Sequence, residues 1–200
     1  MSYSIRTEQP GDQAAIHAMV TRAFDGHPYS DGDEQDVIDR LRADGDLLLS
    51  LVAVDEASGA IIGQITYSPA ILANGDTGWV VLGPVAVEPA HQGKGIGRAL
   101  IEAGEAMMRE HGAKGITVLG NPEIYSRFGF EAGTPMWLAG ELGWAFQVKS
   151  LGSPIPACEQ SYVRAFEGIC DVALRFSSLC VDLQPWQRVI RQDRLALREW

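Results

Sequence analysis

The feature that most restricts the fold is a glycine-rich segment between a β-rich run and an amphipathic helix. The segment reads Gln92-Gly93-Lys94-Gly95-Ile96-Gly97, the β-rich run before it spans residues 79–87, and apolar residues from Ile96 to Met107 recur at steps of three and four. A strand that leads through glycines into a helix is typical of α/β chains, and it gathers backbone N–H groups that have no partner inside the helix. Together with the helix dipole, these groups favour the binding of an anion, phosphate in particular.

The residue types in this segment support an anion site. We expect Gly93, Gly95 and Gly97 to adopt backbone conformations that other residues avoid and to let an anion approach closely. Lys94 and Arg98 place two cations beside them in a chain whose formal net charge is −10. This local contrast in charge favours a phosphate-bearing ligand over a tight turn with a purely structural role.

Two common phosphate-binding motifs do not match the segment. The dinucleotide fingerprint G-x-G-x-x-G would need glycine where Arg98 or Leu100 stands. The P-loop pattern G-x-x-x-x-G-K-[ST] is also absent from the sequence. The pattern that remains is Gln-x-x-Gly-x-Gly, preceded by Gly83-Pro84-Val85-Ala86-Val87-Glu88-Pro89.

Hydrophobic periodicity and turn residues outline the other elements. The first half is expected to contain a strand at 3–7, a helix ending near 24, a helix around 34–42 with Asp33 as its N-cap, and strands at 47–54, 60–68 and 79–87. A helix from 96 to about 111, a strand at 115–119 and a short helix around 123–127 should follow. The last expected elements are a strand from Phe130 and late strands at 144–150 and 161–166. This order predicts an α/β (α+β) fold in which helices flank a mixed central β-sheet. The helix after the glycines would form a right-handed crossover between two parallel strands.

Composition and charge narrow the class of protein. The chain has 46% hydrophobic and 21% charged residues, which matches an ordinary globular protein. No apolar run reaches the roughly 20 residues of a membrane-spanning helix, and residues 1–10 lack a secretory signal, so we expect a cytoplasmic protein without a membrane partner. The acidic charge opposes nucleic acid as a partner, because clustered Lys and Arg bind phosphate backbones. Cys158, Cys170 and Cys180 are too few and too widely spaced to predict a zinc site, and no metal is expected.

Two segments together resemble the GNAT superfamily of N-acetyltransferases. The glycine-rich segment is similar to that superfamily's pyrophosphate loop, [RQ]-x-x-G-x-[GA] after a central strand. Tyr125-Ser126-Arg127-Phe128-Gly129-Phe130 resembles its second landmark, a Tyr followed shortly by Gly-Phe. The likeness implies a GNAT-like domain at residues 1–167 and a C-terminal extension of unknown role at residues 168–200.

The resemblance also implies a cosubstrate, acetyl-CoA, and the residues that bind it. The backbone of Val85, Ala86 and Val87 would pair with the pantetheine arm, and Asn121 would contact the same molecule. The glycine-rich loop would hold the pyrophosphate. The residues of this loop are Gln92, Gly93, Lys94, Gly95, Ile96, Gly97 and Arg98.

Tyr125 falls where many members of the superfamily carry the residue that protonates the departing thiolate. A Tyr hydroxyl, whose pKa is ordinarily about 10, can donate to a thiolate whose thiol pKa is about 8.5. The resemblance thus implies that a primary amine, on a small molecule or a peptide, attacks acetyl-CoA directly in a ternary complex. Dimers are common in the superfamily, which leaves a homodimer open.

The sequence leaves several candidates for the group that removes the amine proton. Neutralising a primary amine of pKa about 10.4 at pH 7 costs roughly 4 to 5 kcal/mol, so a base or a water relay is needed. The clearest members of the superfamily place a Glu within the central strand, whereas this strand is apolar from Val85 to Val87. Glu88, Glu34 and His27 are the alternatives. The missing strand acid also leaves open a second function, that of a non-catalytic acyl-CoA sensor or interaction module of GNAT fold.

Overall fold

The strands of the described chain join into one connected β-sheet with the order β1-β2-β3-β4-β5-β7, while β8 pairs with both β3 and β6. The computed structural model describes residues 2–26, 30 and 32–167. The strands are β1 (Tyr3–Thr7), β2 (Leu49–Asp55), β3 (Ile61–Leu72), β4 (Trp79–Val87), β5 (Gly115–Leu119), β6 (Trp137–Leu138), β7 (Phe146–Ser150) and β8 (Glu159–Tyr162). Neighbouring strands are antiparallel except for the β4–β5 and β6–β8 pairs, which are parallel. The sheet is therefore mixed, as the sequence predicts.

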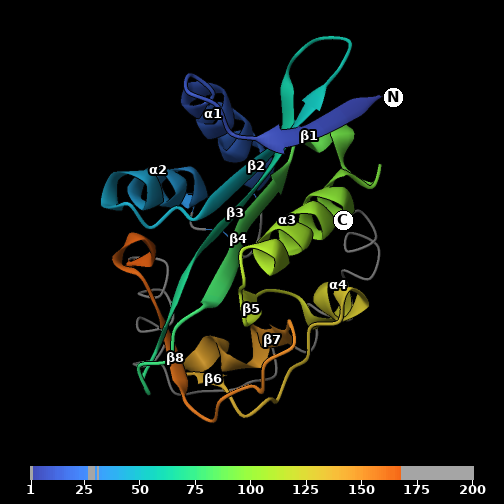
Figure 1. Ribbon diagram of the computed structural model, residues 1–200. Helices are drawn as coiled ribbons and strands as arrows, with labels where there is room; N and C mark the ends of the chain where they lie inside the picture. The colour runs from blue at the N-terminus through green and yellow to red at the C-terminus, as the bar shows by residue number, and fades with distance from the viewer. Residues whose placement is uncertain (1, 27–29, 31, 168–200) are drawn as a thin grey trace.

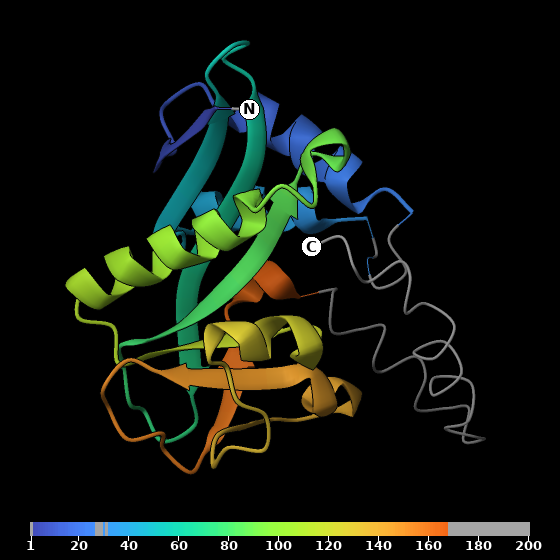
Figure 2. The same cartoon turned by 90° about the vertical axis from the view of Figure 1, so that its right-hand side faces the viewer.

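Helices cover both faces of this sheet (Figures 1 and 2). The helices are α1 (Gln13–Phe24), α2 (Glu34–Asp44), α3 (Ile96–Glu110) and α4 (Pro122–Tyr125), with short 3-10 turns η1 (Pro89–His91), η2 (Ser126–Phe128), η3 (Glu141–Ala145) and η4 (Arg164–Phe166). Leu100 and Met108 of α3 pack into the largest buried cluster, which contains Ile65 and Ile116 of the sheet. On the other face, α1 packs against Val52, Ile61 and Ala86. The glycine-rich segment thus connects the central strand β4 to the helix that covers one face.

Some expected elements differ from the observed ones. No strand begins at Phe130, because Glu131 makes only an isolated bridge with Val148 and the chain then turns away. Residues 144 and 145 belong to η3 rather than to a strand, and β8 ends at Tyr162, before η4. Asp33 occupies the N-cap of α2 but makes no capping hydrogen bond, since its carboxylate pairs with Arg40 at 3.3 Å.

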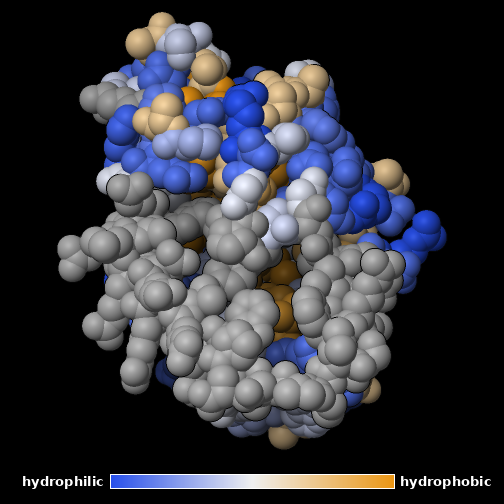
Figure 3. Space-filling view, turned by 180° about the vertical axis from the view of Figure 1, so that it is seen from behind, coloured by the Kyte–Doolittle hydropathy of each residue, from blue (hydrophilic) through white to orange (hydrophobic). Residues whose placement is uncertain are grey.

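The acid-rich α2 exposes its carboxylates to solvent. Asp36, Asp39 and Asp44 are exposed, whereas Val37 and Leu41 on the opposite side of the helix are buried. Figure 3, which views the molecule from behind, shows that hydrophilic residues gather on the upper part of this face. These acids therefore lie on a solvated face of the helix.

The described residues include no helix with both the length and the apolar character that crossing a bilayer requires. The C-terminal extension predicted at residues 168–200 lies outside the described residues, as do Cys170 and Cys180. Cys158 is buried and forms no disulfide within the described chain.

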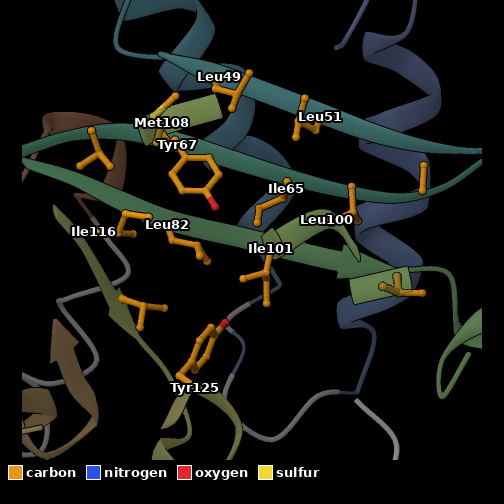
Figure 4. Close-up of a cluster of buried hydrophobic side chains, with 14 of the residues drawn as sticks. Leu49, Leu51, Ile65, Tyr67, Leu82, Leu100, Ile101, Met108, Ile116 and Tyr125 are labelled. Carbon is orange, nitrogen blue, oxygen red and sulfur yellow. The ribbon is translucent and has the colours of Figure 1, made fainter. Parts of the chain in front are cut away.

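Tyr67 of β3 lies fully buried under α3, with its hydroxyl inside the apolar cluster (Figure 4). No described residue accepts or donates a hydrogen bond at that hydroxyl. A Cβ atom at Gly104 would lie 2.4 Å from the Tyr67 ring, so a glycine is needed where α3 crosses this strand. Burial raises the pKa of Tyr67, and the nearby Glu105 and Tyr125 raise it further.

The Tyr67→Phe variant is expected to be more stable than the unaltered protein by about 1 kcal/mol, because it removes a buried hydroxyl without a partner. The difference should grow above pH 10. Above pH 10 the unfolded chain releases the Tyr67 proton while the folded chain keeps it. The free energy of unfolding of the unaltered protein therefore falls by up to about 1.4 kcal/mol per pH unit, and the variant does not undergo this loss. Urea unfolding at pH 8 and pH 11 measures both effects. Lower stability of the variant at both pH values would show that the hydroxyl has a partner.

Candidate active site

The strands β4 and β5 separate in the middle of the sheet, and this separation opens the candidate site. β5 pairs with β4 from Trp79 to Leu82, and in the described chain no strand continues that pairing beside Gly83–Val87. Figure 2 shows the two strands diverging beyond that point. The register between β3 and β4 also shifts here, between Ile65 and Tyr67. One edge of the second half of β4 is therefore available to a ligand.

Val85 and Val87 present their backbone groups to this open edge. Glu88 donates its N–H to the Ile62 carbonyl of β3 at 3.0 Å. Because backbone groups alternate in direction along a strand, Ala86 also faces β3, where it is paired with Gln64, and its two valine neighbours face away from β3. Of the three residues expected to pair with a pantetheine arm, Val85 and Val87 have suitably directed groups, whereas the backbone of Ala86 is used within the sheet.

The glycine-rich loop brings a row of backbone N–H groups to the N-terminus of α3. Within the described residues, the N–H groups from Gly93 to Arg98 have no hydrogen-bond acceptor. Gly93 and Gly95 have φ values of 70° and 83°, in the left-handed region that glycine tolerates best. The first turn of α3 contains no acidic residue and no side-chain cap. This amide cradle, residues 93–98, is a set of unpaired donors at the positive end of a helix dipole.

Gly97 does not have the special backbone conformation that we expected for all three glycines. It lies in the first turn of α3, and its φ is not positive. A Cβ atom there would lie 3.7 Å from Val87 Cγ2, an ordinary contact distance. The difference arises because the helix begins at Ile96, so that Gly97 needs ordinary helical dihedrals.

Three polar side chains of the loop have contacts that fix its shape. Gln92 Nε2 donates to the Val87 carbonyl at 3.2 Å, which ties the start of the loop to the end of β4. Lys94 Nζ donates to the Ala90 carbonyl at 2.7 Å. The Arg98 guanidinium lies 5.9 Å from the centre of the Phe128 ring, within cation–π range. The shape of the loop is thus supported by its own side chains.

Tyr125 ends α4 and lies on the same side of the sheet as α3. Tyr125 is 9% exposed, and its ring packs edge-on against Phe130, with ring centres 5.7 Å apart. Figure 4 shows its hydroxyl directed toward Ile101 of α3. A Cβ atom at Gly120 would lie 2.3 Å from the ring, so this glycine at the end of β5 is required for the placement of Tyr125. Desolvation by burial raises the pKa of Tyr125 to about 12.

Asn121 has a structural contact of its own. Its side-chain oxygen accepts a hydrogen bond from the Glu123 N–H at 2.9 Å and so caps α4. The amide group of Asn121 therefore helps to start the helix that carries Tyr125.

Of the three candidate bases, the structure describes two, and both have partners. Arg22 of α1 contacts both carboxylate oxygens of Glu88, at 2.7 Å and 3.2 Å. Glu34 accepts a hydrogen bond from Ser30 Oγ at 2.7 Å. His27 lies outside the described residues. The pairing of Glu88 could not be foreseen, because Arg22 is 66 residues away in the chain.

Glu88→Gln is expected to keep turnover within about threefold, because the Glu88 carboxylate is engaged through both oxygens in an ion pair with Arg22. Loss of a general base would instead lower turnover by about 10² to 10⁴. The ion pair itself is partly exposed, so its loss should cost less than about 1 kcal/mol of stability. Steady-state kinetics of the variant, with urea unfolding as the check on folding, distinguishes the two roles.

The comparisons with known proteins agree with this geometry. The family model described as Acetyltransferase (GNAT) family matches residues 13–130. YhbS, an uncharacterized N-acetyltransferase of Escherichia coli (strain K12), is 40% identical over 127 residues, which make up 64% of this chain and 72% of that protein.

Two solved structures are similar over most of the chain. A GNAT family acetyltransferase from Brucella melitensis in complex with acetyl-CoA has a TM-score of 0.74 and 38% identity, and the match covers 83% of this chain and 99% of that one. The structure of YhbS from Escherichia coli in complex with CoA has a TM-score of 0.71 and 32% identity, covering 82% of this chain and 91% of that one.

Proposed function

Because the chain belongs to the acetyltransferase (GNAT) family, and is an acyl-CoA-dependent N-acetyltransferase with acetyl-CoA as its cosubstrate, we propose that it acetylates a primary amine of a small molecule or peptide by direct attack in a ternary complex. The observation that carries the proposal is the open edge of β4, which leads directly into the amide cradle. A long ligand with an amide-bearing arm and a diphosphate fits this combination of features.

The binding residues follow from the directions of their groups. The backbone of Val85 and the N–H of Val87 would hydrogen-bond to the pantetheine arm, since they face the open edge of β4 and the Val87 carbonyl is bonded to Gln92. The N–H groups of the amide cradle would hold the diphosphate, helped by the positive charges of Lys94 and Arg98. The capping contact of Asn121 leaves its amide nitrogen to reach the cofactor.

Tyr125 would supply the proton for the departing sulfur. Attack of the neutral amine nitrogen on the thioester carbonyl forms a C–N bond and breaks the C–S bond, leaving a thiolate that needs a proton. The nitrogen releases one proton to solvent, the sulfur takes one from Tyr125, and solvent restores the Tyr125 proton. With a Tyr125 pKa of about 12 and a thiol pKa of about 8.5, complete transfer would be uphill by about 5 kcal/mol. The same desolvation raises the pKa of the thiol, because burial disfavours any anion, and this narrows the difference. In the transition state, Tyr125 then donates a hydrogen bond to the departing sulfur. It transfers its proton as negative charge develops on that sulfur.

The acceptor is proposed to be a primary amine, which is protonated and therefore cationic in neutral water. The net charge of −10 favours the approach of cations and opposes nucleic acid. A cytoplasmic location and a domain boundary at residue 167 stay predictions.

Thiol release from acetyl-CoA tests the proposed function. Polyamines, amino acids, aminoglycosides and short peptides would be assayed as acceptors, with mass spectrometry to identify the acetylated nitrogen. We expect at least one amine to be acetylated at a rate well above hydrolysis. Binding of acetyl-CoA without thiol release for any amine would instead favour the acyl-CoA sensor.

A further inference from the structure

The segment Tyr125–Phe130 is held in place by two cations from other parts of the fold. It comprises the last residue of α4, the turn η2 and the two residues that follow, and its own backbone bonds are few. Phe130 donates its N–H to the Tyr125 carbonyl at 3.2 Å, and Gly129 donates to Ser126 at 3.0 Å. Because such a short helical turn has little stability of its own, contacts from outside must determine where it lies.

Lys149 of β7 makes the polar contacts to this segment. Its ammonium donates to the Phe128 carbonyl at 2.6 Å and lies 5.9 Å from the centre of the Phe130 ring. The same ammonium forms an ion pair with Glu105 of α3 at 2.5 Å. The Lys149 side chain is 20% exposed and that of Glu105 is 18% exposed, so both charges are largely removed from water.

These contacts connect three elements of the fold through one ammonium group. Lys149 joins β7, α3 and the turn after Tyr125 through the Phe128 carbonyl, while Arg98, from the first turn of α3, lies over the ring of the same Phe128. The ring of Phe130 in turn packs edge-on against Tyr125. A displacement of the Lys149 ammonium would therefore be transmitted to the phenol through one backbone contact and one ring contact.

We propose that Lys149 is a positioning residue for acetyl transfer. It holds the Tyr125 hydroxyl in position relative to the amide cradle. The inference rests on the proposed function, in which that hydroxyl protonates the thiolate. Without the ammonium, the Phe128 carbonyl loses its donor, and Glu105 keeps Arg109 as its partner at 2.9 Å. The turn after Tyr125 then keeps its apolar packing and the Arg98 contact but loses its polar anchor. The reaction needs the donor to be placed within a fraction of an ångström.

A spectroscopic test needs no acceptor. 3-Fluorotyrosine placed at position 125 of the full chain gives one fluorine resonance, recorded with and without CoA. We expect Lys149→Met to shift this resonance or split it into several. Lys114→Met is the matched control, because Lys114 also pairs with an acid, Asp76, but lies at the opposite end of β5 from Tyr125. An unchanged resonance in the Lys149 variant would overturn the inference.

A kinetic cycle separates positioning from a general loss of structure. Lys149→Met should lower kcat at least about tenfold, with the affinity for CoA within about threefold of normal. In the Tyr125→Phe background the same change should alter kcat by less than about twofold, since the donor it positions is gone. Independent, multiplying losses would show that Lys149 does not act through Tyr125. Lys149→Gln, which removes the charge but keeps an amide NH2 as donor, replaces the methionine variant if thermal unfolding shows that the latter is misfolded.

The two proposals fail in different ways. If Tyr125→Phe has normal turnover, or no amine is acetylated, the proposed mechanism is wrong, whatever the fluorine spectra show. If Tyr125→Phe is slow but Lys149→Met is as active as Lys114→Met, only the positioning role is wrong.

Discussion

Gly95→Val is expected to lower the affinity for acetyl-CoA at least about a hundredfold. Gly95 has a φ of 83°, a conformation in which a β-branched residue is strongly strained. Relief of that strain moves the N–H groups that follow it at the start of α3. Loss of two charge-assisted hydrogen bonds to a diphosphate, each worth about 1.5 to 3 kcal/mol, lowers affinity by more than two powers of ten. Isothermal titration with acetyl-CoA measures the change.

Gly112→Val provides the control for strain alone. Gly112 follows the C-terminal end of α3 with a φ of 77°, and, as at Gly95, a Cβ atom there would have no neighbour within 4 Å. Both variants should lose about 1 to 3 kcal/mol of stability, because each forces a branched residue into the left-handed region. Gly112→Val should nevertheless bind acetyl-CoA normally. Equal losses of affinity in the two variants would mean that the loop has no direct part in binding.

Tyr125→Phe is expected to lower kcat by about 10² while leaving the affinity for acetyl-CoA within a few-fold of normal. The ring keeps its packing against Phe130, and what is lost is the proton donor. At high pH the difference between the two proteins should shrink. The hydroxyl loses its proton near pH 12 in the free protein, and an ionised phenol cannot donate. Pre-steady-state thiol release separates this chemical step from product release.

Tyr3→Phe is the matched control for the loss of a phenol. Tyr3 packs at the margin of the same buried cluster. It lies in β1, which β2, β3 and β4 separate from β5 in the sheet. Its substitution should leave kcat unchanged. If Tyr125→Phe turned over the best acceptor as fast as Tyr3→Phe does, another group would have to protonate the thiolate.

The parts of the site that the sequence predicts are those determined by neighbouring residues. The glycine-rich loop, the helix that follows it and the bounds of β4 and β5 all depend on local periodicity and on the conformational freedom of glycine. The open edge of β4 could be expected from the family resemblance, but its detail could not. That Val85 and Val87 face the gap while Ala86 faces β3 depends on the register between two strands.

The parts that the sequence does not predict depend on contacts between distant segments. The ion pair of Glu88 with Arg22 and the contacts of Lys149 join residues that no periodicity relates. The strand expected at Phe130 was wrong for a similar reason. Apolar residues there pack under α3 as part of the large cluster instead of extending along an edge of the sheet. A short apolar run cannot distinguish these two forms of burial.

A crystal structure of the complex with acetyl-CoA would decide whether the amide cradle holds the diphosphate, on which the proposed mechanism depends. We expect phosphate oxygens within hydrogen-bond distance of N–H groups between Gly93 and Arg98, with the pantetheine arm beside Val85 and Val87. A diphosphate bound elsewhere on the molecule, with these N–H groups left to solvent, would show that the proposed binding mode is wrong.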